Sequence, residues 1–280
     1  MKLLSFTAAG KASYGALSGD SIADLGRRTP YPTLRAALEA NAMAELRAAV
    51  IASAADYKLT DVTLLTPVPD AGKIICIGIN YKGHILEMGR KLPEQPSVFF
   101  RLHSSLVAHA ANIIRPKVSN DFDYEGELAV VIGKGGRHIS RDAALSHIAG
   151  YTCFNDGSIR DFQMKGSLAV GKNFASTGSV GPYMVTADEI EDPSKLRLET
   201  RLNGTRMQHT GIDDLIFDIP AIIAYVSAAF PLAPGDIVAT GTPEGVAMGR
   251  TPPTWMKPGD VLEIEIPNVG LLRNTVVQEA

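Results

Sequence analysis

The segment Asp121–Gly133 holds the acidic residues whose spacing most clearly suggests chemistry. Glu125 and Glu127 stand two positions apart, directly before the apolar run Leu128–Ile132. Side chains at positions i and i+2 of a β-strand share one face, about 6.5–7 Å apart along the chain. Two carboxylates at the entrance of a buried strand are costly unless a proton or a cation neutralises them. A hard divalent cation such as Mg²⁺ would do so, although these two residues alone leave a site without metal equally open.

A second polar segment, Asn155–Gln163, directly follows the apolar residues Ile148–Phe154. Loops at strand ends often hold functional residues. Asp156, at the start of this loop, is therefore the natural third metal ligand. We expect Arg160 and Asp161 to form a local ion pair or to support the ligands, rather than to react themselves.

A histidine and a glutamate follow the strand predicted at Ile74–Gly78. His84 and Glu87 are three residues apart, which makes them neighbours on one turn of a helix. A glutamate beside an imidazole raises its basicity and fixes its tautomer, as suits a general base for water. An ordinary surface pair is the alternative. The remaining histidines lack such a partner in the sequence and are expected to be structural: they stand at positions 103, 109, 138, 147 and 209.

A second Glu-x-Glu pair, Glu263 and Glu265, provides an internal comparison. It alternates with Leu262, Ile264 and Ile266. Clean alternation of this kind is typical of a strand with one buried and one solvated face. The sequence therefore predicts an exposed pair here, without a metal.

The elements that must position these residues are mostly short strands separated by Gly, Pro and Asp. Two helices are expected: a short one capped by Ser140 and running to His147, and Ile219–Phe230, opened by Asp218. With so few helices between strands, a doubly wound parallel sheet is excluded. We expect an α+β, β-rich fold, mixed and largely antiparallel, with peripheral helices. The predicted strands are Ile74–Gly78, Ser97–Phe100, Glu127–Ile132, Gly150–Asn155, Ile237–Thr240, Val261–Ile266 and Leu271–Val277.

The first 66 residues differ from the rest. Strands are predicted at Lys2–Thr7 and Ser21–Leu25, and the Ala- and Leu-rich segment Thr33–Ala55 predicts one or two helices. Prolines at positions 67 and 69 then interrupt regular structure. We therefore expect a small N-terminal α+β domain over residues 1–66 and a larger catalytic domain over residues 67–280.

Composition narrows the class of protein. Among 280 residues, 27 are basic and 30 acidic, a net charge of −3, so a nucleic-acid partner is not expected. No apolar run reaches the roughly 20 residues of a membrane span. No Gly-x-Gly-x-x-Gly motif follows a predicted strand and no P-loop motif occurs, so the sequence does not indicate a nucleotide site. The two cysteines, Cys76 and Cys153, lie in apolar surroundings. Two buried thiols and no signal peptide predict a cytoplasmic protein.

Seven segments in register resemble the fumarylacetoacetate hydrolase family. The resemblance covers roughly residues 67–280. The matching segments are Lys73–Glu87, Asp123–Gly133, Phe154–Gln163, Gly171–Pro182, Leu202–Gln208, Ile216–Tyr225 and Pro234–Gly245.

The resemblance implies a rolled mixed β-sheet, a homodimer, and a divalent cation, commonly Mg²⁺ with Mn²⁺ or Ca²⁺ possible. Glu125, Glu127 and Asp156 match the family's metal ligands. Its catalytic residues fall on the water-activating pair His84 and Glu87, carried on a lid segment, and on Lys172, which faces the substrate. The positions expected to bind substrate are Tyr81, Arg101, Gln163, Gln208 and Thr242.

The activity implied is hydrolysis of a carbon–carbon bond in a 2,4-dioxo acid, an acylpyruvate or a fumarylpyruvate-like compound, as in the breakdown of aromatic compounds. Water activated by His84 and Glu87 would attack the distal carbonyl, and a metal-held pyruvate enolate would leave. Decarboxylation of a 2-oxo diacid, keto–enol isomerisation, and isomerisation or hydration of a 2-hydroxydienoate use the same enolate chemistry and stay open. A non-catalytic, metal-stabilised binding protein is the remote alternative.

Two departures from the family pattern bear on the substrate. Arg101 stands where the family often has lysine, which keeps the charge but changes its geometry. Ala175 stands where many members have aspartate. Both changes affect the expected substrate more than the expected metal site.

Overall fold

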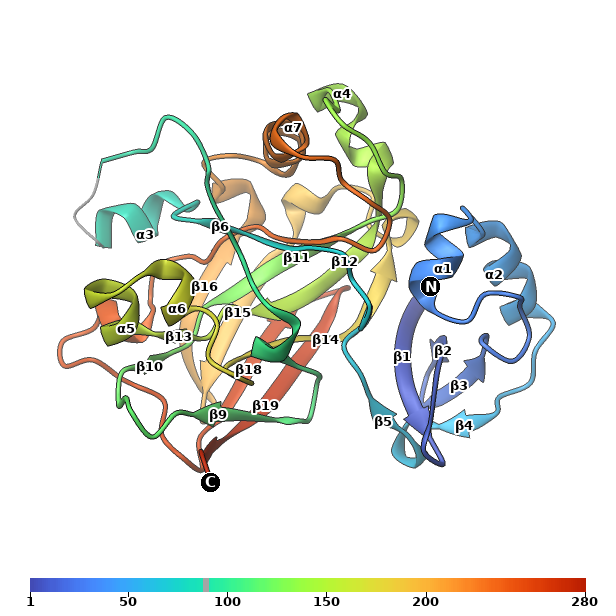
Figure 1. Ribbon diagram of the computed structural model, residues 1–280, viewed down its shortest axis with the longest axis horizontal. Coiled ribbons are helices and arrows are strands. Elements are labelled where there is room, and N and C mark those ends of the chain that lie inside the picture. Colours follow the sequence, from blue (N-terminus) through green and yellow to red (C-terminus); the bar gives the residue numbers. More distant parts are fainter. Residues whose placement is uncertain (88–90) are drawn as a thin grey trace.

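A large mixed sheet forms the body of the protein. The computed structural model describes residues 1–87 and 91–280, and at residue 84 it describes the backbone alone. Most neighbouring strands are antiparallel, while β17 and β6 pair in parallel. In spatial order the strands are β4 (Tyr57–Lys58), β3 (Ser21–Asp24), β2 (Lys11–Ser18), β1 (Lys2–Ala8), β14 (Gly178–Thr186), β12 (Ile148–Asn155), β11 (Gly126–Ile132), β17 (Ile237–Ala239), β6 (Ile74–Gly78) and β7 (Ser97–Phe100), with β5 (Thr63–Leu64) beside β1 and β8 (Leu106–Val107) beside β14 (Figure 1).

A smaller sheet packs against the large one. Its strands are β16 (Thr205–Gly211), β15 (Arg197–Leu202), β18 (Val261–Ile266), β19 (Gly270–Gln278) and β9 (Asn112–Arg115). A separate two-stranded pair joins β10 (Phe122–Asp123) to β13 (Ser158–Ile159). The predicted β-rich α+β fold is confirmed, and every strand expected between residues 73 and 280 is present to within two residues at each end.

Strand β11 is buried along its whole length because both of its faces are covered. Leu128 and Val130 join a core shared with Ile264 of the smaller sheet. Ala129 and Val131 face the opposite way, toward residues of the N-terminal helices. Burial on both faces explains why this strand is an uninterrupted apolar run rather than an alternating one.

Helices lie around the sheets. Asp218 caps α7 by accepting from the Ala221 amide at 2.8 Å, and Ser140 caps α4 through Ala143. Asn41, with φ +54°, lies in the break that divides the segment predicted at 33–55 into two helices. None of the helices in the described residues has the length and apolar character that a membrane crossing requires. They are α1 (Leu34–Glu39), α2 (Met43–Ile51), α3 (Lys82–Glu87), α4 (Arg141–Ala144), α5 (Arg160–Lys165), α6 (Leu168–Gly171) and α7 (Ile219–Ala229).

The N-terminal residues form a lobe of their own in Figure 1 and also extend the large sheet. Strand β1 pairs with β14 at Lys2↔Val185 and Leu3↔Met184. The division into domains at residues 66 and 67 stays a prediction, with the addition that hydrogen bonds of one continuous sheet cross it.

Strands β14, β15 and β16 are absent from the sequence prediction. Strand β14 contains the Gly181-Pro182 step, which argues against a strand in a single sequence. In the structure, the ladder between β12 and β14 shifts register between Tyr151 and Cys153, opposite this step. The irregularity lets a strand with a Gly-Pro step stay inside the sheet.

Candidate active site

Three buried carboxylates converge where β11 begins and β12 ends. Gly126 pairs with Asn155 across the two strands, and the Asp156 amide donates to the Glu125 carbonyl at 2.9 Å. This register places Asp156 beside the two glutamates. One carboxylate oxygen from each of Glu125, Glu127 and Asp156 lies within 4.8 Å of the others. The structure thus brings the three predicted metal ligands together.

Cations neutralise two of these three carboxylates. Lys172 Nζ lies 2.7 Å from Glu125 Oε2 and 2.6 Å from Asp156 Oδ2. Arg101 Nη1 lies 2.6 Å from Asp156 Oδ1, and Arg160 Nη2 lies 2.6 Å from Glu125 Oε1. Burial alone would lower the pKa of Lys172, but the charges of Asp156 and Glu125 outweigh burial and raise it. The lysine is therefore a protonated, charge-stabilising group.

Glu127 is the carboxylate that no described cation pairs with. It accepts a hydrogen bond from the Gly241 amide at 2.8 Å and is 1% exposed. Burial, followed by the charges of Asp156 and Glu125, raises its pKa well above the ordinary value. A buried anion in this position favours a second positive charge beside it. Three hard oxygen donors and one uncompensated carboxylate fit a divalent cation.

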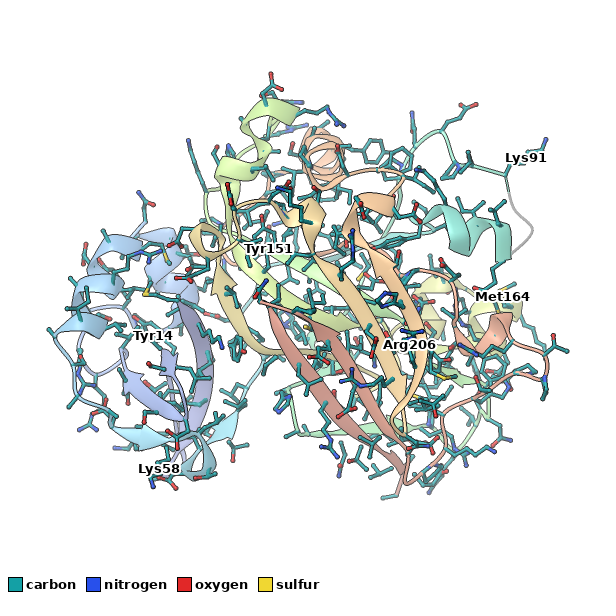
Figure 2. All side chains as sticks on the ribbon, turned by 180° about the vertical axis from the view of Figure 1, so that it is seen from behind. Tyr14, Lys58, Lys91, Tyr151, Met164 and Arg206 are labelled. Atoms are coloured by element: carbon teal, nitrogen blue, oxygen red, sulfur yellow. The ribbon has the colours of Figure 1, made fainter. Side chains whose placement is uncertain are left out.

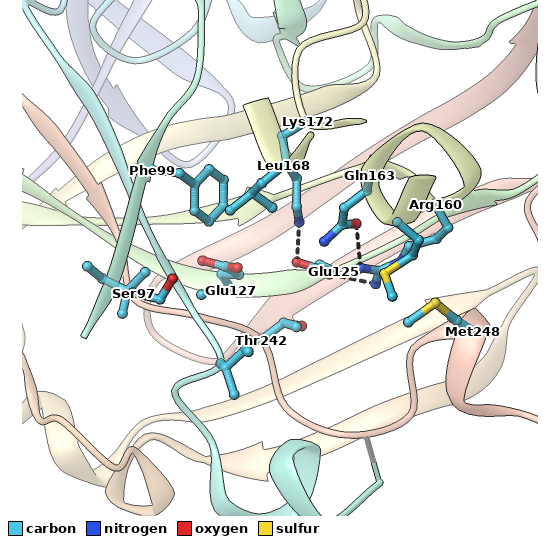
Figure 3. Close-up of a pocket in the computed structure, with 14 residues that line it drawn as sticks. Ser97, Phe99, Glu125, Glu127, Arg160, Gln163, Leu168, Lys172, Thr242 and Met248 are labelled. Atoms are coloured by element: carbon cyan, nitrogen blue, oxygen red, sulfur yellow. Dashed lines mark hydrogen bonds and ion pairs between the residues drawn. The ribbon is translucent and has the colours of Figure 1, made fainter. Parts of the chain in front are cut away.

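A cavity of about 350 Å³ opens over the carboxylates (Figure 3). Gln163, Lys172 and Thr242 line it, as expected for residues that meet a substrate. Arg160 Nη1 donates to Gln163 Oε1 at 2.9 Å, which fixes the orientation of the glutamine amide. The other lining residues are Ile77, Gly78, Ile79, Ser97, Phe99, Glu125, Glu127, Arg160, Met164, Leu168 and Met248.

Three residues expected to bind substrate lie behind the cavity wall. Arg101 is buried against Asp156 and also donates to the Gly157 carbonyl. Gln208 accepts from the Gly126 amide and donates to Thr242 Oγ1 and the Pro243 carbonyl, each at 2.9 Å. The contacts of Arg101 and Gln208 suit them to holding in place the segments that carry Glu125, Glu127 and Asp156.

The third of these residues is Tyr81, which is fully buried. Its hydroxyl contacts no hydrogen-bond partner within the described part of the chain. Burial and the nearby charge of Glu127 raise its pKa. The hydroxyl is therefore a neutral, buried group that does not line the cavity.

Helix α3 carries the expected His84–Glu87 pair. Glu87 Oε1 accepts from the Gly245 amide at 3.0 Å, and a methyl group at Gly249 would overlap the Glu87 carboxylate. Glu87 therefore rests on the segment that also contributes Met248 to the cavity. The side chain of His84 lies outside the described residues, so the expected pair stays a prediction.

The structure adds one acidic residue that the sequence reasoning missed. Asp123 is fully buried and forms an ion pair with Arg160, with Nε and Oδ2 separated by 2.8 Å. Of the two roles expected for Arg160, support behind a ligand fits these contacts. Asp161 instead accepts from Ser119 Oγ at 2.6 Å. The repeated spacing Asp123, Glu125, Glu127 is the sequence signal that singles out Asp123.

The chain is similar to known proteins over most of its length. Residues 73–277 match the family model described as fumarylacetoacetate (FAA) hydrolase C-terminal. The chain is 42% identical over 226 residues to oxaloacetate tautomerase YisK of Bacillus subtilis (strain 168), covering 79% of this chain and 75% of that protein.

Two solved structures share the whole fold. Maleylpyruvate hydrolase from Sphingobium sp. SYK-6, in complex with manganese(II) and pyruvate, superimposes with a TM-score of 0.84 at 31% identity, with all of both chains covered. A 5-carboxymethyl-2-hydroxymuconate delta-isomerase from Mycobacterium smegmatis does so with a TM-score of 0.80 at 30% identity, again over 100% of both chains. The similar proteins thus span a tautomerase, a hydrolase and an isomerase.

Proposed function

The chain belongs to the fumarylacetoacetate hydrolase family, a family of enzymes, and we propose that it interconverts the keto and enol forms of a small 2-oxo dicarboxylic acid such as oxaloacetate. The single observation that carries the proposal is the set of side chains in the cavity that can transfer a proton. Among the described lining residues, Lys172 is the one non-acidic side chain that can donate and regain a proton, because the guanidinium of Arg160 stays protonated. Tautomerisation needs one such group. Hydrolysis needs a water-activating base as well.

The carboxylates of Glu125, Glu127 and Asp156 would hold the divalent cation, for which we propose Mg²⁺, with Mn²⁺ or Ca²⁺ as alternatives. When bound, the cation supplies Lewis-acid polarisation of the oxygen at C2 of the substrate. The support for Mn²⁺ is the manganese complex of the maleylpyruvate hydrolase that shares the fold.

Lys172 would hold the proton that moves. Its Nζ touches two of the three carboxylates, so it lies beside any ligand that they hold. In the enol-to-keto direction, the enol hydroxyl loses its proton to water and the ammonium of Lys172 donates one to C3. Lys172 then regains a proton from solvent, and the reverse reaction uses the same groups. An ammonium here also stabilises the negative charge that builds up on the substrate.

Gln163 would orient the substrate. Arg160 fixes the glutamine oxygen, and no described acceptor engages its nitrogen Nε2, which leaves that N–H group to donate to a carboxylate of the substrate. Met164, Leu168 and Met248 form an apolar border of the same cavity. An apolar border keeps water away from the enol and strengthens each charge inside.

A second candidate is the carbon–carbon hydrolysis of a 2,4-dioxo acid. Two observations favour it: the maleylpyruvate hydrolase with the same fold, and the position of Glu87, three residues after His84 on the helix beside the cavity. In this reaction His84 would take a proton from water, and Lys172 would stabilise the resulting oxyanion. The homodimer and the cytoplasmic location remain predictions under either function.

One assay separates the two functions. Purified protein is given enol oxaloacetate, and the loss of enol absorbance is followed with Mg²⁺ and with EDTA; pyruvate release is measured in parallel from acetylpyruvate and fumarylpyruvate. We expect metal-dependent ketonisation that falls strongly in Lys172→Met and is kept in His84→Ala. Metal-dependent pyruvate release that disappears in His84→Ala, with no ketonisation, would replace the tautomerase by the hydrolase. His138→Ala, at an exposed position that does not line the cavity, is the control.

A further inference from the structure

Asp123 is a buried carboxylate beside the site. It is not one of the three candidate metal ligands. On an unbroken strand, Asp123, Glu125 and Glu127 would all face the same side. Here β10 ends at Asp123 and β11 begins only at Gly126. Because the strand is interrupted, the Asp123 side chain is not part of the group whose oxygens lie within 4.8 Å of one another.

Three donors from two other segments converge on Asp123. Arg160 Nε donates to Oδ2 at 2.8 Å, and the Ala247 and Met248 amides donate to Oδ1 and Oδ2 at 2.7 and 3.2 Å. The carboxylate is 0% exposed. Its acceptor capacity is thus used by the protein itself, which is the pattern of a supporting residue rather than of a ligand.

Arg160 passes this constraint on to the cavity. Once Nε is held by Asp123, the planar guanidinium has a fixed orientation. Its other two nitrogens then meet Glu125 Oε1 at 2.6 Å and Gln163 Oε1 at 2.9 Å. Figure 3 shows Arg160 with its contacts to these two residues at the edge of the cavity.

The two amides lead in the other direction, to the segment under α3. Met248 lines the cavity. The neighbouring Gly245 amide donates to Glu87, and Gly249 lies against the Glu87 carboxylate. Asp123 therefore contacts both the arginine that pairs with Glu125 and the segment on which Glu87 of α3 rests.

We infer that Asp123 is a positioning residue that locks Arg160 and, through it, sets the orientation of the Glu125 carboxylate and of the Gln163 amide. The inference rests on the proposed function only in taking Glu125 as a metal ligand. It does not depend on which substrate is turned over.

The test is the direct titration of EDTA-stripped protein with Mn²⁺ by calorimetry. Asp123→Asn keeps the size of the side chain and the oxygen that accepts from the Ala247 amide, but it places an N–H group against Arg160. We expect the Mn²⁺ dissociation constant to rise roughly 10–100-fold, as when a supporting residue of a metal ligand is lost. Asp161→Asn is the matched control, since Asp161 follows Arg160 directly and contacts Ser119 instead; its affinity should stay within about twofold of wild type.

A double-mutant cycle tells positioning from direct binding or a merely structural role. Arg160→Lys keeps a charge for Glu125 but removes the fork that Asp123 orients, and it should weaken Mn²⁺ binding by a similar factor. Added to Arg160→Lys, Asp123→Asn should then cost little more, because both changes break one chain of contacts. A purely additive loss, or wild-type affinity in Asp123→Asn, would overturn the inference.

Three further outcomes are decisive. If Asp123→Asn does not fold, Arg160→Lys alone carries the test, and unchanged Mn²⁺ affinity in that variant overturns the inference. If wild-type protein turns over no substrate yet Asp123→Asn weakens Mn²⁺ binding as expected, the inference stands and the proposed reaction fails. If wild-type protein binds no Mn²⁺, both fail.

Discussion

The pairs Glu125/Glu127 and Glu263/Glu265 have the same spacing, and they lie at two strands that pack against each other. Their burial and their partners differ. Glu125 and Glu127 are 6% and 1% exposed and gather with Asp156. The side chains of Glu263 and Glu265 are 18% and 42% exposed and pair with Arg201, at 3.2 and 2.8 Å. Spacing places two carboxylates on one face of a strand. The layer that this face meets decides whether they gather with a third carboxylate or reach solvent.

The residues between the glutamates explain the difference. Gly126 and Ile264 both point into the space between the sheets, and a methyl group on Gly126 would lie 3.4 Å from Ile264 Cγ1. The glutamates flanking each of them therefore point away from that shared core, in opposite directions. On β18 that direction leads to the outer face, which carries the labelled Arg206 in Figure 2. On β11 it leads to the cavity.

The largest expected effect is at Glu127. Glu127→Gln keeps the hydrogen bond from the Gly241 amide but removes the one carboxylate that lacks a described cationic partner. We expect roughly a 1000-fold loss of Mg²⁺ affinity, equivalent to about 4 kcal/mol, measured by calorimetry, and turnover as low as that of wild type in EDTA. Glu263→Gln, the same change in the pair on β18, should alter neither quantity. Equal effects in the two variants would remove the distinction between the pairs.

The second effect concerns the lysine between the buried carboxylates. Lys172→Met removes the ion pairs to Glu125 and Asp156 and leaves apolar bulk beside Phe99. Removing one partner of a buried pair costs about 3 kcal/mol, which urea unfolding in EDTA should detect. Saturating Mg²⁺ should reduce the loss because the metal supplies positive charge to the same carboxyl groups.

Lys195→Met is the control for this experiment. Lys195 is 79% exposed and lies 3.5 Å from Asp192, so its loss should leave the free energy of unfolding nearly unchanged. A loss in Lys172→Met that Mg²⁺ does not reduce would argue that Lys172 and the cation act on different groups.

The third effect tests the contact between Gly126 of β11 and the smaller sheet, at Thr200 of β15. In Gly126→Ala, the added methyl would overlap Thr200 Oγ1, so the sheets or the flanking glutamates must shift. Overpacking of this kind costs about 1–3 kcal/mol, measured as a change in the urea midpoint, and should weaken Mg²⁺ binding at the same time. Thr200→Ala in the same protein removes the overlapping atom and should restore most of both losses. If it restores neither, the glycine matters for another reason.

The local parts of this arrangement were predictable from sequence. The apolar run after Glu127 predicts a buried strand, and the polar residues after Phe154 predict a loop that contains a candidate ligand. Both signals involve residues that are neighbours in the chain. The structure adds that these two ends meet, because β11 and β12 pair in the register Gly126↔Asn155.

The long-range partners could not be predicted in this way. Arg101 and Asp156 are 55 residues apart, and Asp123 and Arg160 are 37 apart, so no local pattern links them. The expectation of a local ion pair between Arg160 and Asp161 shows the same limit. Adjacent opposite charges in a sequence favour the prediction of a local pair, while in the folded protein Arg160 pairs with the buried Asp123. Strand β14 was missed because its Gly-Pro step is tolerated only through the register shift in β12.

The smallest effect is expected on the outer face. Arg201 lies 2.8–3.2 Å from Glu199, Glu263 and Glu265, and hydrogen bonds from its guanidinium to these carboxylates raise its pKa. In Arg201→Gln the three glutamates lose their shared cation and repel one another. Because solvent reaches this face, the cost should be only about 1 kcal/mol in urea unfolding at low salt and should shrink at high salt. Mg²⁺ affinity should not change, because the cavity lies on the far side of the interface between the sheets. A loss of metal binding would mean that Gly126 and Ile264 couple the two glutamate pairs rather than separate them.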